Sequence, residues 1–290
     1  MRLAIVGLGL IGGSIARALA ARDAGVWHVT AWSRNPEGPR TALADAVVDV
    51  VARTPEEAAE EADLVLLAAP PLANLALVAG LGPAVAASDA VLTDVTSAQA
   101  VIAGVAAGIP GLRHVGGHPM AGTEARGYDA ARADLFVDRP WILVPSASAD
   151  PEDVDRVRRL AVACGAVPLE LRPDEHDRLV AAISHLPLIV AAALAETVTS
   201  SPSWQPASRL AAGGWRDSTR VARGDPELGA GIAALGRSEL LPWIDRFAAT
   251  LESWRADVAA LPDDPARSDA GRLRSRFDSV RAALLDESGR

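Results

Sequence analysis

The apolar positions follow different patterns in the two halves of the chain. In the first half, short apolar runs alternate with alanine-rich stretches of helical spacing. After a first run at Leu3–Val6, the later runs are Trp27–Trp32, Leu64–Ala69, Ala90–Thr93, His114–Val115 and Trp141–Val144. This alternation is typical of a doubly wound, mostly parallel sheet with helices on both faces. We therefore predict an α/β domain at residues 1–168.

After Pro168 the pattern changes to helical periodicity, and it predicts no further strand. Helical spacing is found around residues 174–200, 238–260 and 269–286. We predict an all-α domain at residues 169–290. An apolar stripe on the last stretch is made by Leu273, Phe277, Val280 and Leu284. We interpret this stripe as core packing or as a subunit seam.

A glycine-rich motif, Gly7-Leu8-Gly9-Leu10-Ile11-Gly12, directly follows the first apolar run and opens a helical stretch. In a dinucleotide-binding unit, the first glycine allows the turn, the second admits the pyrophosphate and the third lets helix and strand pack closely. The helix N-terminus then faces the phosphates. The motif predicts a Rossmann domain with a nicotinamide-nucleotide site formed by Gly7, Gly9, Leu10, Ile11 and Gly12.

The end of the second predicted strand bears on the choice of cofactor. An NAD enzyme is expected to carry an acidic residue there, to bind the ribose hydroxyls. This chain has Ser33 and Arg34. Ser33 can hydrogen-bond a 2′-phosphate and Arg34 can pair with it, which favours NADP. An arginine can also stack on adenine, so NAD stays open. We further assign Pro70 and Asp94 to the cofactor site.

His118 lies in the glycine-rich segment Gly116–Glu124, downstream of the nucleotide motif. The unperturbed pKa of a histidine is close to neutral, so its imidazole can take a substrate proton at working pH while a cofactor takes the hydride. We predict that His118 is a general base in a loop. The alternative is a loop histidine that caps a turn.

Composition narrows the chemistry further. A formal net charge of −9 over 290 residues argues against nucleic acid as the main partner. The single cysteine, Cys164, excludes an internal disulfide and leaves too few thiols for structural zinc, so we interpret it as a buried apolar residue and predict no metal site. All basic side chains are arginine, which excludes a catalytic lysine.

We expect no membrane partner and a cytoplasmic location. No apolar run reaches the roughly eighteen residues of a membrane span. The N-terminus leads directly into a strand and the glycine motif, without a basic region and a cleavage site.

Six motifs in order make the chain resemble the prephenate/arogenate dehydrogenase family of tyrosine biosynthesis over nearly its whole length. They are GLGLIGGS, DVTS, GGHPMAGTE, EHD, SHLP and GGWRDSTR. The resemblance implies a Rossmann domain followed by a helical domain through which two subunits dimerise. It also implies an oxidative decarboxylation, in which hydride leaves the hydroxyl carbon for NAD(P), carbon dioxide leaves the opposite carbon and the ring becomes aromatic.

The resemblance also implies roles for single residues. His118 accepts the proton of the ring hydroxyl, and Ser97 orients His118 and that hydroxyl. Ser97 is alternatively the N-cap of the helix expected there. Arg220 matches an arginine that grips a substrate carboxylate, as a bidentate guanidinium does well. His185 matches a substrate-binding histidine, although it could also be a satisfied core residue.

Three further residues belong to the predicted substrate region. We include Gly213 and Asp217 among the substrate-site residues, with Asp217 expected to hold its loop or Arg220 rather than to touch substrate. His176, within the EHD motif, either caps the helix that opens there or contributes to the pocket.

Some positions depart from the family pattern. Leu188 replaces a frequent histidine, Gly229 a tryptophan and Gln99 a lysine, so we expect an altered pocket wall. A dehydrogenase acting on 4-amino-4-deoxyprephenate therefore stays open as an alternative. A non-catalytic NAD(P)-binding sensor is the alternative of another class. It would leave His118, Ser97 and Arg220 without a joint purpose.

Overall fold

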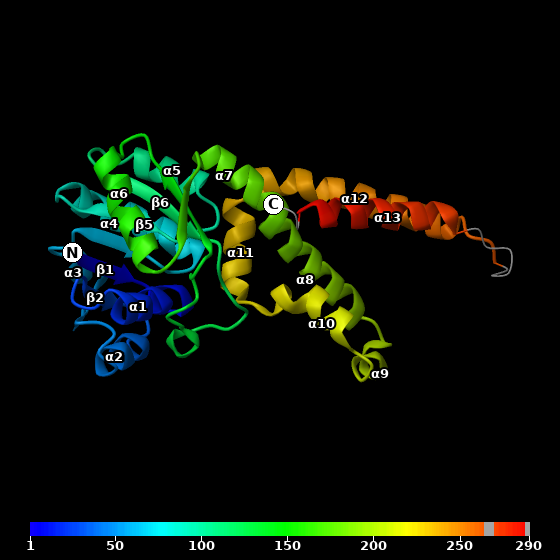
Figure 1. Ribbon diagram of the computed structural model, residues 1–290, viewed down its shortest axis with the longest axis horizontal. Coiled ribbons are helices and arrows are strands. Elements are labelled where there is room, and N and C mark those ends of the chain that lie inside the picture. The colour runs from blue at the N-terminus through cyan, green and yellow to red at the C-terminus, as the bar shows by residue number, and fades with distance from the viewer. Residues whose placement is uncertain (264–269, 288–290) are drawn as a thin grey trace. The chain divides into compact units, whose positions relative to one another are not determined.

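The computed structural model describes residues 1–263 and 270–287, and its packing divides the chain into two units, Met1–Leu240 and Leu241–Arg290. The first unit is built on an eight-stranded sheet in the order β3-β2-β1-β4-β5-β6-β7-β8 (Figure 1). The strands are β1 (Arg2–Val6), β2 (His28–Trp32), β3 (Val50–Val51), β4 (Leu64–Leu67), β5 (Val91–Asp94), β6 (His114–Pro119), β7 (Pro140–Pro145) and β8 (Val167–Glu170). Only β6 and β7 pair antiparallel among these strands. The predicted doubly wound sheet is confirmed.

Helices cover both faces of this sheet. They are α1 (Leu10–Arg22), α2 (Glu37–Ala44), α3 (Pro55–Ala59), α4 (Pro71–Ala86), α5 (Ala100–Ala107) and α6 (Pro151–Ala163). In β1, Leu3 and Ile5 pack on the face that holds α1 and α6, while Ala4 and Val6 pack on the face that holds α4 and α5. Side chains of a strand alternate between faces, so a continuous apolar run can serve two cores. Cys164 is fully buried in the first core, as predicted, and burial raises the pKa of its thiol.

Two sequence-based expectations about strands were wrong. The segment with His118 is not a loop, because His114–Pro119 forms strand β6 and His118 pairs with Ile142 of β7. A strand also follows the last predicted one: β8 extends the sheet to Glu170 by parallel pairing with β7. The predicted boundary after Pro168 therefore falls inside β8, and the domain limits themselves stay a prediction.

The rest of the first unit is helical. A nearly continuous helix is formed by α7 (Pro173–Val180), a π-helical turn η2 (Ala181–His185) and α8 (Leu186–Thr199). Contrary to expectation, this run is long and apolar enough to cross a membrane, with an 18-residue window of mean hydropathy 1.9 that is 22% buried. It also carries buried histidines that belong to the site described below. After it come α9 (Trp204–Ser208), α10 (Gly213–Thr219), the 3-10 turn η3 (Arg220–Arg223) and α11 (Pro226–Leu235).

The second unit consists of most of α12 (Arg237–Ala259), together with α13 (Gly271–Glu287). The Trp254 and Phe277 rings lie 4.9 Å apart between centroids. Phe277, Val280 and Leu284 of the predicted stripe are exposed, while Leu273 is half-buried. Most of the stripe is therefore not buried among the described residues of the second unit, and its place in a subunit seam stays a prediction.

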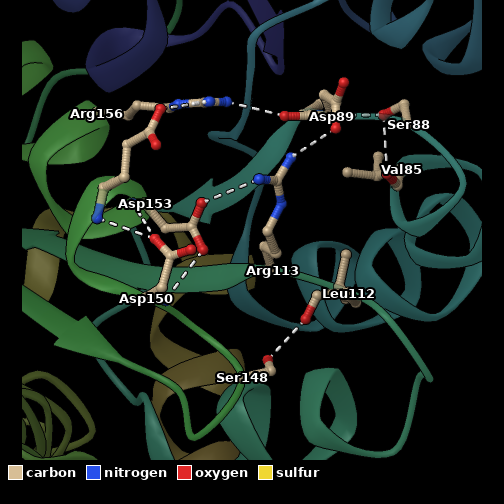
Figure 2. Close-up of polar contacts among 11 residues, drawn as sticks. Val85, Ser88, Asp89, Leu112, Arg113, Ser148, Asp150, Asp153 and Arg156 are labelled. Carbon is tan, nitrogen blue, oxygen red and sulfur yellow. Dashed lines mark hydrogen bonds and ion pairs between the residues drawn. The ribbon is translucent and has the colours of Figure 1, made fainter.

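A polar cluster holds the edge of the sheet where β5 and β6 begin. Figure 2 shows Arg113 reaching Asp153 of α6, with 3.5 Å between Nη1 and Oδ1, and Arg156 donating to the backbone oxygen of Asp89 at 2.8 Å. Asp150 caps α6, and the Asp153 carboxylate accepts the backbone N–H of Asp150 at 3.1 Å. This capping box and its arginines fix α6 at the end of the sheet opposite to the site.

Candidate active site

The glycine motif has the geometry that a dinucleotide site requires. Gly7 has a φ of +107°, and a Cβ there would lie 2.6 Å from the backbone carbon of Ala68. A Cβ at Gly12 would overlap the Gly7 oxygen. Gly9, the N-cap of α1, has nothing within 4 Å of the place a Cβ would take. The loop is thus closed toward the protein and open at the helix N-terminus, where a pyrophosphate binds.

A cavity of about 360 Å³ lies at the carboxyl ends of the central strands. This is the edge at which open α/β sheets bind ligands, and the strand order reverses here between β1 and β4. Six of the predicted site residues line it: Gly9, Leu10, Ile11, Pro70, Ser97 and His118. One cavity therefore joins the glycine motif to the predicted base.

The other predicted cofactor residues lie outside its lining. Ser33 is half-buried after β2, and Arg34 is exposed with its Nη2 3.8 Å from Oε2 of Glu227. Asp94 is fully buried, and its carboxylate accepts the backbone N–H of Thr96 at 2.8 Å and lies 3.1 Å from Nε2 of His114. Asp94 thus shapes the turn after β5 from inside the protein.

His118 is 8% exposed and lies on β6. Its Nδ1 is 2.8 Å from Nε2 of His176, so its ring bonds another side chain and does not cap a turn. Burial lowers the pKa of His118 well below its usual 6.5, with smaller contributions from His176 and His185. The imidazole is consequently neutral at neutral pH, which is the state a general base needs.

His176 and Asp177 of α7 continue this contact into the protein. His176 is fully buried, and its Nδ1 lies 2.8 Å from Oδ1 of Asp177. The Asp177 carboxylate accepts the backbone N–H groups of Gln99 at 2.7 Å and Ala100 at 2.9 Å, at the start of α5. The sequence pointed to His176 and to His118 separately but not to their contact, and it gave Asp177 no role. The EHD motif was the only signal for His176 or Asp177.

Ser97 presents a hydroxyl to the cavity. Its Oγ is buried and, within the described part of the chain, has no hydrogen-bond partner. Since α5 begins at Ala100 with Gln99 as its N-cap, Ser97 does not cap that helix. A buried hydroxyl without a partner is costly, so its hydrogen bond is available for a ligand.

Gln99 replaces the lysine expected from the family pattern and is fully buried. Its Nε2 lies 3.0 Å from Oδ1 of Asp94, 2.7 Å from the Thr96 oxygen and 3.0 Å from the Gly117 oxygen. A Cβ at Gly116 would overlap Oε1 of Gln99. The glycines before His118 therefore let β6 pass close to the turn after β5, and they do not mark a loop.

The predicted substrate residues are more dispersed. Arg220 opens η3, is exposed, and lies 3.4 Å from Oε2 of Glu124 through its Nη1. A backbone hydrogen bond and the Arg220 guanidinium lower the pKa of Glu124. Gly213 and Asp217 are exposed on α10. None of the three predicted residues lines the cavity, but Arg220 reaches the segment that follows His118.

His185 ends the π-helical turn and is 1% exposed. Neither of its ring nitrogens has a partner among the described residues, and Nδ1 lies close against Gly236. Burial is the main cause of its lowered pKa. Its neighbour Ser184 lines the cavity instead. A π-helical turn is frequent at functional sites, and here it places Ser184 on the cavity wall.

Two features near the cavity were not expected from the sequence. The departing positions Leu188 and Gly229 are neighbours, since a Cβ at Gly229 would lie 3.9 Å from Cδ2 of Leu188. Arg126 lines the cavity and reaches Asp225, with 3.5 Å between Nη1 and Oδ2. The cavity wall therefore carries the guanidinium of Arg126, whereas Leu188 and Gly229 are not among its lining residues.

Comparison with known proteins agrees with this geometry. Residues 15–170 match the family model "Prephenate dehydrogenase, nucleotide-binding domain", and residues 172–269 match "Prephenate dehydrogenase, dimerization domain". The chain is 35% identical over 265 residues to a cyclohexadienyl dehydrogenase of Zymomonas mobilis, covering 90% of both proteins.

Two crystal structures are similar over nearly the whole chain. The Synechocystis arogenate dehydrogenase matches with a TM-score of 0.74 and 30% identity, over 98% of this chain and 100% of that one. The A. aeolicus prephenate dehydrogenase, in complex with hydroxyphenyl propionate and NAD+, matches with a TM-score of 0.85 and 26% identity, over 99% and 98%.

Proposed function

Because the chain belongs to the prephenate/arogenate dehydrogenase family, we propose that it oxidises prephenate or arogenate, with His118 as the base and NADP as the preferred acceptor. The family reaction is the NAD(P)-linked oxidative decarboxylation of tyrosine biosynthesis. The observation that carries our assignment is the shared cavity, which is lined by the glycine motif, by a neutral buried imidazole and by a serine hydroxyl without a partner among the described residues.

In this proposal the glycine motif and the N-terminus of α1 hold the cofactor phosphates, and Leu10, Ile11 and Pro70 contribute the walls. The nicotinamide supplies an acceptor for the hydride of the hydroxyl-bearing carbon. His118 takes the hydroxyl proton at Nε2, while Ser97 hydrogen-bonds the same oxygen. Loss of the ring carboxylate as carbon dioxide leaves its bonding electrons in the ring, which becomes aromatic.

Arg220 is the proposed partner of a substrate carboxylate. Its present contact with Glu124 joins two exposed side chains, and such pairs contribute little in water. A substrate dianion in a protein of net charge −9 requires a local cation, and a bidentate guanidinium–carboxylate pair is among the stronger polar contacts. We keep His185, Gly213 and Asp217 as supporting residues of this region.

The preference for NADP rests on Ser33 and Arg34, because neither would repel a 2′-phosphate. Among the residues that the structure describes, Arg34 contacts only Glu227, at 3.8 Å, and it can turn toward a ligand. We expect Arg34→Gln to raise KM for NADP and to leave KM for NAD nearly unchanged. An equal change for both cofactors would contradict the assignment.

We also propose a homodimer through the helical region, because the matched family model is a dimerisation domain. The second unit leaves several large apolar side chains exposed: Leu251, Val258, Phe277, Val280 and Leu284. Burial of such a set in a subunit interface removes apolar area from water. We propose the cytoplasm as the location, in keeping with the biosynthetic family to which the chain belongs.

The test is the formation of reduced nicotinamide by the purified protein, with prephenate and arogenate each offered with NADP and NAD. Turnover with one pair identifies the substrate side chain and the cofactor together. Turnover with 4-amino-4-deoxyprephenate alone would replace the proposed substrate class. A protein that binds cofactor but turns over none of these substrates would be a sensor, and substitution of His118 would then change nothing.

A further inference from the structure

We propose that His176 and Asp177 act as positioning residues that hold His118 in one tautomer, with the proton on Nδ1 and the lone pair of Nε2 facing the substrate hydroxyl. The inference rests on the proposed role of His118 as the base. Three buried side chains, Asp177, His176 and His118, are linked by hydrogen bonds. The inference follows from which group must be the donor in each of these bonds.

The direction is set at Asp177. Its carboxylate accepts two backbone N–H groups, from Gln99 at 2.7 Å and Ala100 at 2.9 Å. These donors lie at the N-terminus of α5, where the helix dipole stabilises a negative charge. An ionised carboxylate can only accept hydrogen bonds. The third contact, 2.8 Å from Nδ1 of His176 to Oδ1, therefore has the imidazole as its donor.

The same direction passes through His176. A neutral imidazole that donates through Nδ1 has its lone pair on Nε2. That Nε2 lies 2.8 Å from Nδ1 of His118, so with a neutral His176 the donor in this contact is His118. The proton of neutral His118 is then on Nδ1, and its Nε2 is free to accept the proton of a bound hydroxyl. The opposite tautomer would bring two lone pairs together at 2.8 Å.

Burial keeps this arrangement in place. His176 is fully buried, Asp177 is 4% exposed and His118 is 8% exposed. Water has little access to supply alternative partners, so a reversed tautomer would leave buried groups unsatisfied. After His118 has taken a proton at Nε2, its Nδ1–H still bonds His176, and the Asp177 charge stabilises the cation through that ring. His176 and Asp177 therefore keep their protons unchanged during the reaction.

The first test needs no variant. The chain has five histidines, so nitrogen-15 NMR of the purified full chain with labelled histidine can assign the tautomer of each ring. We expect His118 to carry its proton on Nδ1, with and without NADP. A neutral His118 with its proton on Nε2 would overturn the inference.

The second test is Asp177→Asn. The amide keeps the shape of the carboxylate but is uncharged and offers one acceptor oxygen to the three donors that the carboxylate binds. It therefore no longer fixes Nδ1 of His176 as the donor, and the tautomer with a proton on Nε2 of His118 becomes populated. We expect kcat to fall about 10²–10⁴-fold, the range of general-base contributions, with KM for the cofactor little changed. The NMR signature of His118 should switch in the same sample.

Asp150→Asn is the matched control, because Asp150 caps α6 as Asp177 caps α5 and lies at the other end of the sheet. Both variants weaken a helix cap, but only D177N is expected to lower kcat. A D177N enzyme with unchanged kcat, or with reduced kcat and an unchanged His118 tautomer, would overturn the inference. Failure of the His118 assignment is separate, since His118→Asn would then leave turnover intact.

Discussion

The two ends of the sheet both use carboxylates to cap a helix, but they do so with different partners. At the edge where β5 and β6 begin, Asp150 caps α6 from the adjacent turn, and the nearby arginines are partly exposed (Figure 2). At the opposite edge, Asp177 caps α5 from 77 residues away in the chain, and its third contact is a buried histidine.

The cap on α6 is a local interaction, whereas the cap on α5 is a long-range one. The cap on α6 is complete within four residues, and among the described residues its arginines reach only groups at the same edge of the sheet. The cap on α5 ties α7 to the turn after β5 and, through His176, to His118 on β6. A change at the first end should alter stability alone, whereas a change at the second should alter stability and chemistry together.

The largest effect is expected for His118→Asn. Loss of the base should lower kcat about 10²–10⁴-fold, while cofactor affinity is kept because the glycine motif is untouched. Steady-state kinetics and a fluorescence titration with NADP measure the two quantities. Near-wild-type turnover would show that His118 is not the base.

Two glycines of the nucleotide motif provide the next comparison. In Gly12→Ala the new Cβ would overlap the Gly7 oxygen, so we expect a loss of about 1–3 kcal/mol in the free energy of unfolding. In Gly9→Ala the Cβ meets nothing within 4 Å, so stability should change by less than about 0.5 kcal/mol.

Gly9→Ala should nevertheless weaken NADP binding, because the methyl group takes the space of the pyrophosphate. Urea denaturation and cofactor titration of both variants separate the two effects. Equal cofactor affinity in Gly9→Ala and the wild type would place the phosphates elsewhere.

Acid should affect the buried histidines next. The folded pKa of His118 and that of His185 lie below the unfolded value near 6.5, so the unfolded chain binds more protons in that range. The free energy of unfolding should therefore be constant above that pH and fall as the pH drops below it. His118→Gln should reduce this dependence between about pH 7.5 and about pH 5.5 in urea titrations. An unchanged pH dependence would contradict the lowered pKa.

The smallest effect is expected at the opposite edge, for Arg156→Met. The change removes a hydrogen bond to the Asp89 oxygen and a pair with Glu152, whose side chain is largely exposed. Such contacts contribute at most about 1 kcal/mol. The melting temperature should drop slightly and kcat should not change, and a large loss of turnover would show that the two ends are coupled.

Features set by local pattern could be predicted from the sequence. The glycine motif and the long helices depend on neighbouring residues, so periodicity and glycine spacing identified them. Strand β8 was missed because Val167–Glu170 is short, contains a proline and is mostly exposed at the edge of the sheet. Strand β6 was mistaken for a loop because two glycines precede His118, although a close approach to Gln99 requires them.

Contacts between segments that are distant in the sequence could not be predicted from it. His118 and His176 are 58 residues apart, and their contact exists only because β6 and α7 meet beside the turn after β5. Asp94 is another example. We assigned it to the cofactor site, and its carboxylate turns inward to His114, 20 residues away in the chain. The direction of a side chain at a strand end depends on which neighbour can satisfy it.

The packing of Gln99 against Gly116 constrains how this region can evolve. Its amide oxygen occupies the volume that any side chain at position 116 would need. A mutation at 116 is therefore harmful while Gln99 is present, but it becomes tolerable once position 99 carries a smaller residue. The order in which the two substitutions arise then decides which lineages survive, and in relatives with a different residue at 99 the history of position 116 should differ as well.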